Sequence, residues 1–202
     1  MKREEARQKL IDGAIHVIAD EGLDKATTKL VGQYTNINQV YIYRCFKSKD
    51  DMFAKMFDVL DNQLLHIVTQ NIDIMYMTAI EFKVRCKVFF FKLWSFLLAN
   101  RENCLSYVRY YYSPYFKTYS EAIHKQRFWP VVEQFRGVFI DEADVWMIIN
   151  YILNVMLDFA IKVHQGEMSK DDDYAEHVYR VIYAAIKQYF KEYFRDEKER
   201  NS

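Results

Sequence analysis

A short segment near the N-terminus concentrates positive charge that nothing nearby in the sequence neutralises. The whole chain has 28 basic and 28 acidic residues, yet residues 25–49 contain no acidic side chain. The cations of this segment are Lys25, Lys29, Arg44, Lys47 and Lys49. Uncompensated positive charge on a small segment is the electrostatic pattern of a phosphate-binding face. The segment therefore favours contact with nucleic acid, and a chance run on a solvated surface is the alternative.

The residues around these cations predict two short helices joined by a turn. The first helix is expected over 28–34, the turn over 35–37 and the second helix over 38–45. A longer helix over 4–21, with apolar residues at helical spacing and Gly22 as its terminator, precedes the pair. In such a helix-turn-helix the second helix can lie in the major groove of DNA.

The sequence of this segment resembles the DNA-binding domain of TetR-type transcriptional regulators. The resemblance is carried by Thr27-Thr28-Lys29-Leu30-Val31-Gly32 and by NINQVYIYRCFKSKDDM from Asn36 to Met52. Leu10, Ala14 and Gly22 also stand where that family places its first helix. The resemblance implies a homodimer whose C-terminal domain both dimerises and binds a small effector. It also implies that the effector releases the protein from a double-stranded DNA operator.

Individual DNA contacts follow from the positions that match the family's motif. Thr28, Tyr43 and Lys49 match positions that usually contact phosphates, and Lys29 belongs to the same expected interface. Three further residues project from the second helix as candidates for the groove: Gln39, Tyr41 and Arg44. Glutamine and arginine can make two parallel hydrogen bonds to adenine and guanine edges. The spacing of Val31, Ile42 and Phe46 points these side chains into the core.

The segment departs from the family's usual pattern at several positions. Asn36 stands in place of the turn glycine, which asparagine tolerates because it also adopts the left-handed conformation. Asn38 replaces a frequent serine N-cap and is an equivalent cap. Val40 and Tyr41 are bulkier than usual, so the operator contacts can differ from the family's average. Cys45 is either a packed thiol or a redox switch.

The remainder of the chain predicts an all-α protein of about nine helices. Five glycines and two prolines in 202 residues leave too few turn-formers for a many-stranded sandwich. We expect a helix-turn-helix DNA-binding domain at 1–47 and an effector-binding and dimerisation domain at 48–202. A helix over 48–71, opened by a capping box of Ser48 and Asp51, would connect them.

Further helix boundaries in the second domain follow from its caps and breakers. Helices are expected over 78–100 and 101–112, and Pro114 marks the next start. Pro130 should kink or restart the pattern before Gly137. Asp141 and Ser169 should head the last two long helices, the second with Asp172 as capping-box partner and the first closed by Gly166.

Aromatic side chains in the middle of the chain suit an apolar effector chamber with a few hydroxyl groups. Simple core packing is the alternative for each of them. The candidate effector residues are Phe90, Trp94, Tyr107, Tyr111, Phe128, Asn154 and Asp158. Asn150, Asn154 and Asp158 form one helical stripe, which can line the chamber, meet a dimer partner or face solvent. Arg85 and Arg109 can meet an anionic group or make exposed salt bridges.

The predicted partners are an operator, an unidentified effector and a second copy of the chain. The last helix has apolar residues at heptad-like spacing, and with the preceding helix it can build an intersubunit four-helix bundle. Polar interruptions of the apolar stretch 145–163 favour a buried helix over a membrane span, and the charged N-terminus favours the cytoplasm. We expect a ligand-responsive repressor of a palindromic operator, released by a small apolar or aromatic effector.

The alternative is a helical enzyme or a small-molecule-binding module that does not bind DNA. The sequence has no glycine-rich phosphate loop, paired-cysteine site, His-Glu-x-x-His motif or nucleophile elbow. The five histidines are scattered at spacings that do not suit a metal site. We therefore expect no catalytic residues, no metal and no cofactor.

Overall fold

The computed structural model describes residues 2–194, and within that range the chain forms ten α-helices, three short 3-10 helices and no strand. The all-α prediction is confirmed, with one helix more than expected. The chain divides into two compact units. Of the described residues, unit 1 comprises 2–64 and 100–125, and unit 2 comprises 65–99 and 126–194. The functional boundary expected between residues 47 and 48 stays a prediction.

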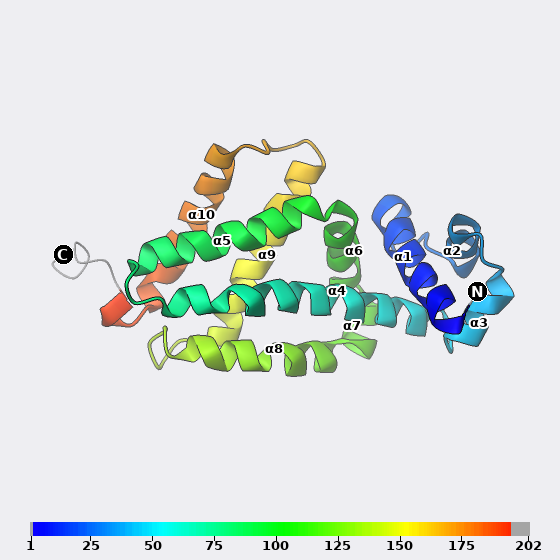
Figure 1. The fold of residues 1–202 in the computed structure, drawn as a ribbon, viewed down its shortest axis with the longest axis horizontal. Coiled ribbons are helices and arrows are strands. Elements are labelled where there is room, and N and C mark those ends of the chain that lie inside the picture. The colour runs from blue at the N-terminus through cyan, green and yellow to red at the C-terminus, as the bar shows by residue number, and fades with distance from the viewer. Residues whose placement is uncertain (1, 195–202) are drawn as a thin grey trace. The chain divides into compact units, whose positions relative to one another are not determined.

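Unit 1 contains the three N-terminal helices and a second group of helices from the middle of the chain (Figure 1). The first group is α1 (Arg3–Glu21), α2 (Thr28–Thr35) and α3 (Gln39–Cys45), followed by the first part of α4 (Lys49–Asn71). The second is α6 (Arg101–Tyr111), α7 (Pro114–Tyr119) and the first residues of α8 (Glu121–Arg136). Both α2 and α6 pack against α1.

Local side-chain caps explain the short helices of unit 1. Thr27 accepts a hydrogen bond from the Leu30 N–H at 3.1 Å, and Asn38 accepts one from the Val40 N–H at 2.9 Å. Asn36 between these helices is left-handed, with φ 54° and ψ 35°, as expected for a residue in place of glycine. These contacts fix where α2 and α3 begin, because each cap satisfies a backbone N–H group in the first turn of its helix.

Gly32 is required by the geometry of the turn, and Ser48 caps the start of α4. A Cβ on Gly32 would lie 2.7 Å from the Ile37 carbonyl oxygen, so the turn requires glycine there. Ser48 accepts from the Asp51 N–H at 3.0 Å, as the predicted capping box requires. The Asp51 carboxylate accepts from the N–H of Lys47 at 2.9 Å, one residue earlier than the reciprocal bond expected.

Side chains of α6 hold the C-terminal half of α1 by its backbone carbonyls. Ser106 is fully buried and donates its hydroxyl to the Ile15 carbonyl at 2.6 Å. The Arg109 guanidinium donates to the carbonyls of Ile18 and Ala19, the latter at 2.7 Å. Arg109 is therefore a half-buried brace between helices, and the exposed salt bridge considered from the sequence is not what it forms.

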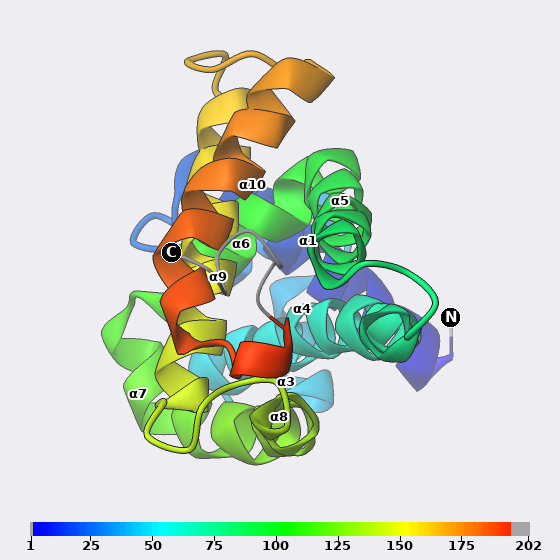
Figure 2. The same cartoon turned by 90° about the vertical axis from the view of Figure 1, so that its left-hand side faces the viewer.

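Unit 2 contains the last part of α4, α5 (Phe82–Ala99), the rest of α8, α9 (Val145–His164) and α10 (Asp172–Ile186). Its 3-10 helices are η1 (Ile72–Tyr76), η2 (Lys187–Tyr189) and η3 (Glu192–Phe194). Helices α9 and α10 run side by side, and both contact α5 (Figure 2). The chain after α10 returns to the segment after α8, where the Ile140 N–H donates to the Tyr189 carbonyl at 2.8 Å.

Several boundaries in unit 2 differ from those expected. Helix α5 begins at Phe82, four residues late, because residues 77–80 form a turn closed by the Ile80 N–H and the Met77 carbonyl. Pro130 lies inside a continuous α8, so of the two expected alternatives, a kink or a restart, the restart is wrong. The N-caps of α9 and α10 are Asp144 and Asp171, and not Asp141 and Ser169. Each observed aspartate accepts from the backbone N–H three residues on, which is the N-cap bond.

By length and composition, α9 is apolar enough to cross a membrane, and a third (33%) of its apolar window is buried inside the structure. Its buried residues include Ile148, Met156 and Ala160, and the helix packs against α5 and α10. Such packing is also found in core helices of soluble proteins. Gly166 follows the helix with φ +77°, and its N–H donates to the Val163 carbonyl at 3.1 Å.

Candidate nucleic-acid interface and ligand cavity

Helix α3 presents one polar and partly aromatic face to solvent. Ile42 and Cys45 are buried on its inner face, and Val31 and Phe46 are buried in the neighbouring segments, so the predicted core residues are confirmed. Lys29 on α2 is exposed, as are Gln39, Tyr43 and Arg44 on α3, while Tyr41 is half-buried. The exposed face of α3 therefore carries the side chains that the sequence assigned to DNA.

Two of the predicted DNA-contacting residues are hydrogen-bonded to each other. Thr28 is only 6% exposed, and its hydroxyl oxygen accepts a bond from the Gln39 side-chain amide at 2.8 Å. The bond fixes the amide of Gln39 and leaves the hydroxyl proton of Thr28 able to donate to a phosphate oxygen. Thr28 is the first residue of α2, and the backbone N–H groups at a helix N-terminus favour an anion.

Aromatic rings lie beside two of the cations in this region. The Arg44 guanidinium lies 5.7 Å from the ring centre of Tyr41. The Lys49 ammonium lies 5.6 Å from the ring centres of both Phe53 and Tyr115. Contact with a ring face holds a cation in place without neutralising its charge. Both cations therefore stay available to a negatively charged partner.

Val40 is an exposed residue of α3 that the sequence reasoning did not assign to DNA. It is 66% exposed on the same helix as Gln39 and Arg44, although valine is usually buried. An apolar side chain on a recognition helix can contact a thymine methyl group. The sequence shows that Val40 is bulky. The side of α3 on which it lies follows from the two buried positions of that helix, Ile42 and Cys45.

Unit 2 contains a cavity of about 100 Å³. Its walls come from α5, α8, α9 and α10, with Val68 from the end of α4 and Met75 from η1. The lining side chains are apolar except for the thiol of Cys86 and the hydroxyls of Tyr179 and Tyr183. The Tyr179 hydroxyl donates to the Lys83 carbonyl at 2.8 Å. A cavity with such walls favours an apolar guest over water.

The candidate effector residues fall into different parts of the molecule. Phe90 and Phe128 line the cavity, and Trp94 stacks on Phe90 with 5.7 Å between ring centres. Asn154 is half-buried on α9, and Asp158 is exposed and paired with Lys162 at 2.8 Å. Neither of these two residues lines the cavity.

The other two effector candidates, Tyr107 and Tyr111, lie in unit 1, in an aromatic cluster around α4. Their ring centres are 5.9 Å apart. The Tyr107 hydroxyl donates to the Asp61 carboxylate at 3.2 Å, and the same oxygen atom lies 2.8 Å from Nδ1 of His124. Asp61 and His124 are 0% and 4% exposed. Both tyrosines belong to this cluster of unit 1, and neither is among the residues that line the cavity of unit 2.

Comparison with known proteins matches residues 10–56 to the model of the bacterial regulatory proteins of the tetR family. The N-terminal segment of the chain is therefore similar to the regulators of this family. The match covers α2, α3, most of α1 and the start of α4, so it includes every residue assigned to DNA. The resemblance inferred from the sequence is confirmed. No curated protein sequence matches the chain significantly.

Solved structures extend the TetR-like fold beyond the matched segment. A TetR family transcription regulator from Marinobacter aquaeolei VT8 has a TM-score of 0.73 at 12% identity, over 92% of this chain and 98% of that chain. A TetR-like transcriptional regulator from Rhodococcus sp. RHA1 has a TM-score of 0.64 at 15% identity, over 92% and 96%. The regulator FadR from Bacillus subtilis, solved with stearoyl-CoA, has a TM-score of 0.62 at 15% identity, over 87% and 96%.

Proposed function

We propose that this TetR-family chain is a ligand-responsive repressor that binds a palindromic operator as a homodimer. A small, mainly apolar effector would bind in unit 2 and release the operator. The observation that carries this proposal is the apolar cavity in a chain whose N-terminal domain is of the DNA-binding type. The structurally similar FadR from Bacillus subtilis holds stearoyl-CoA, a ligand with a long apolar chain.

Helix α4 offers the physical connection between ligand and DNA. It begins at Lys49, four residues after the end of α3, and the same continuous helix provides Val68 to the cavity wall. A ligand that prefers one position of this helix shifts the population of DNA-binding conformations. The coupling free energy expected for such a device is about 1–3 kcal/mol, and it acts equally on both ligands.

Homodimerisation through α9 and α10 would leave one recognition helix for each half of the operator. Both helices expose large apolar side chains: Met147 and Tyr151 on α9 are 51% and 37% exposed, and Val181 on α10 is 58% exposed. One short helix reads only a few base pairs, so a two-fold dimer is needed for useful affinity. A palindromic operator follows from that symmetry.

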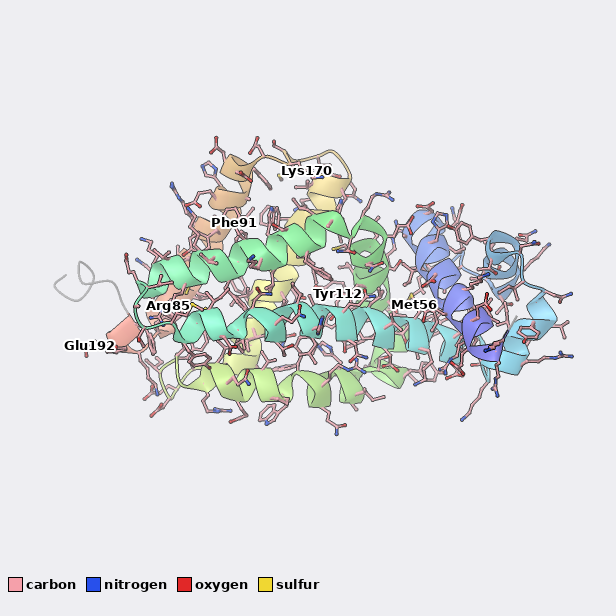
Figure 3. The ribbon with its side chains drawn as sticks, viewed as in Figure 1. Met56, Arg85, Phe91, Tyr112, Lys170 and Glu192 are labelled. Atoms are coloured by element: carbon pink, nitrogen blue, oxygen red, sulfur yellow. The ribbon has the colours of Figure 1, made fainter. Side chains whose placement is uncertain are left out.

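The proposal is tested on DNA from upstream of the protein's own gene. Footprinting should show a protected site with dyad symmetry, and fluorescence anisotropy should show that it binds a dimer. Lys49→Ala should flatten the plot of log affinity against log salt by about one unit. Lys170→Ala is the control, because Lys170 is an exposed cation in the connection between α9 and α10 (Figure 3). No binding at low salt, or a protected site without symmetry, would overturn the proposal.

Repression and release are tested separately. Deletion of the gene should raise transcription from the bound promoter, and an apolar compound that quenches the fluorescence of Trp94 should weaken operator binding. An unchanged or lower transcript level would contradict repression. TetR-family regulators are generally non-enzymatic DNA-binding proteins, and no activity is proposed for this chain.

A further inference from the structure

Arg85 on α5 is a buried cation that has no carboxylate partner in the described part of the chain. Its side chain is only 5% exposed. Its Nη1 donates to the Met75 carbonyl at 2.5 Å, and its Nε–H is buried without an acceptor in the part of the chain that the structure describes. Within residues 2–194 no aspartate or glutamate forms an ion pair with it. The sequence predicts that Arg85 either meets an anionic group or makes an exposed salt bridge. The burial of Arg85 excludes the exposed salt bridge.

Arg85 is not itself a lining residue of the cavity of unit 2, but it contacts residues at one end of the cavity wall. Met75, whose carbonyl it contacts, is a wall residue. The central carbon of the Arg85 guanidinium lies 5.1 Å from the ring centre of Phe82. The ring of Phe82 in turn packs edge-on against the wall residue Phe190, with 5.0 Å between the ring centres. The next residue, Cys86, also lines the cavity. Figure 3 shows Arg85 between the start of α5 and the end of α4.

Lys83 is a second cation near this end of the cavity. The Lys83 ammonium lies 5.7 Å from the ring centre of the wall residue Tyr183. On α10, the Glu176 carboxylate is held by Lys87 at 2.7 Å and by Arg180 at 3.1 Å. Asp73 on η1 is exposed. An anion at this end would therefore meet Arg85 without competition from an ion-paired carboxylate of the described chain.

A buried cation is costly unless it is paired and fully hydrogen-bonded. One carbonyl and one aromatic ring satisfy the guanidinium of Arg85 only in part. The edge of a guanidinium that contains Nε takes a planar carboxylate through two parallel N–H···O bonds. We propose that the effector of this chain is an amphipathic carboxylate, with its acid group on Arg85 and its hydrocarbon part in the cavity. This inference rests on the proposed function and specifies the ligand class of the same cavity.

The test compares octanoate with 1-octanol, which share an apolar chain and differ in charge. Binding to the full chain is measured by calorimetry in the absence of DNA. Octanoate should bind at least about tenfold more tightly than 1-octanol, because a charge-assisted pair forms only with the acid. Equal affinities, tighter binding of the alcohol, or binding of neither compound would overturn the proposal. This comparison needs no variant and so holds even where a substitution disturbs folding.

Variants then separate ligand pairing from a structural role of Arg85. Arg85→Met should weaken octanoate about tenfold or more and leave 1-octanol unchanged. Lys92→Met, which removes an exposed cation of the same helix, should change neither affinity. If Arg85→Met weakens acid and alcohol equally, Arg85 only positions η1 through the Met75 carbonyl, and the proposal is wrong.

Operator release distinguishes this inference from the proposed function. If 1-octanol binds as tightly as octanoate and both release the operator, ligand-responsive DNA binding stands and the carboxylate class is wrong. If octanoate binds selectively through Arg85 but leaves operator affinity unchanged, the ligand class stands and release by this ligand is wrong.

Discussion

In unit 1 aromatic rings surround polar groups that are hydrogen-bonded to one another, whereas in unit 2 they surround free space with an apolar wall. The centre of unit 1 is Asp61, which contacts Tyr107 and His124, and the ring of Phe57 packs against both of these residues. The centre of unit 2 is the cavity, with Phe90 and Phe128 in its wall.

The difference shows how similar side chains serve opposite purposes. A buried polar network that is fully satisfied specifies one arrangement, since any movement leaves a donor or acceptor without its partner. An apolar wall has no such directional requirement, and its side chains can move to admit a guest. Unit 1 is therefore suited to hold the helix-turn-helix in one geometry, and unit 2 is suited to respond to ligands.

The largest effect is expected from removing the hub of unit 1. Asp61→Ala leaves the buried His124 and the Tyr107 hydroxyl without the carboxylate between them. A buried group that loses its hydrogen-bond partner costs about 1–3 kcal/mol, so the two groups together cost about 2–6 kcal/mol. The free energy of unfolding, measured by urea denaturation and circular dichroism, should fall by that amount.

A surface aspartate provides the control for this substitution. Asp158 is exposed and paired with Lys162 on the surface of α9, so Asp158→Ala should leave the free energy of unfolding nearly unchanged. Equal losses for the two variants would show that the Asp61 cluster contributes no more than a surface pair, and the contrast between the units would fail.

The two buried arginines provide the next comparison. Arg109 in unit 1 donates to two carbonyls of α1, whereas Arg85 in unit 2 donates to one carbonyl and has no acceptor for its Nε–H among the described residues. Arg109→Met should lower the free energy of unfolding by about 1.5–3 kcal/mol, the value of hydrogen bonds to charged groups. Arg85→Met should be neutral or stabilising, because it replaces a poorly compensated charge by an apolar side chain. The reverse order would contradict the contrast.

Enlarging one buried valine in each unit tests whether the cavity of unit 2 can accept an additional methylene group. Val31 in unit 1 is 0% exposed, and Val131 in unit 2 is 2% exposed and lines the cavity. Val31→Leu should cost about 1–3 kcal/mol by overpacking, while Val131→Leu has room for the extra methylene. Urea denaturation measures both costs. If Val131→Leu is as costly as Val31→Leu, the cavity is not available space.

The helix-turn-helix was predictable because its determinants lie close together in sequence. The caps Thr27 and Asn38 accept hydrogen bonds from N–H groups two or three residues away. Asn36 forms the turn through its own left-handed backbone conformation. The resemblance to TetR-type regulators covers these same residues. For this part of the molecule the sequence was sufficient for the fold and for the exposed face of α3.

The division of the aromatic residues between the two units could not be predicted. Tyr107 belongs to unit 1 because it bonds to Asp61, 46 residues away, and nothing in the spacing of the aromatic residues shows that pairing. The burial of Arg85 was equally hidden, because its acceptor is a backbone carbonyl, which every residue carries. The N-caps of α9 and α10 were misplaced because several aspartates and a serine compete at each helix start.

The smallest effect is expected from chemical labelling of two cysteines, which modifies only their thiols. In unit 1, burial raises the pKa of Cys104 to about 12, so at pH 8 only about one molecule in ten thousand carries its thiolate. In unit 2, Cys86 is half-buried and lines the cavity. Because the thiolate is the reactive form, iodoacetamide at pH 8 should label Cys86 and leave Cys104 unmodified until the chain unfolds. Peptide mass spectrometry measures both rates, and a ligand in the cavity should slow only the labelling of Cys86. Labelling of native Cys104 as fast as Cys86 would show that the core of unit 1 opens as readily as the cavity, which the hydrogen-bonded network around Asp61 should prevent.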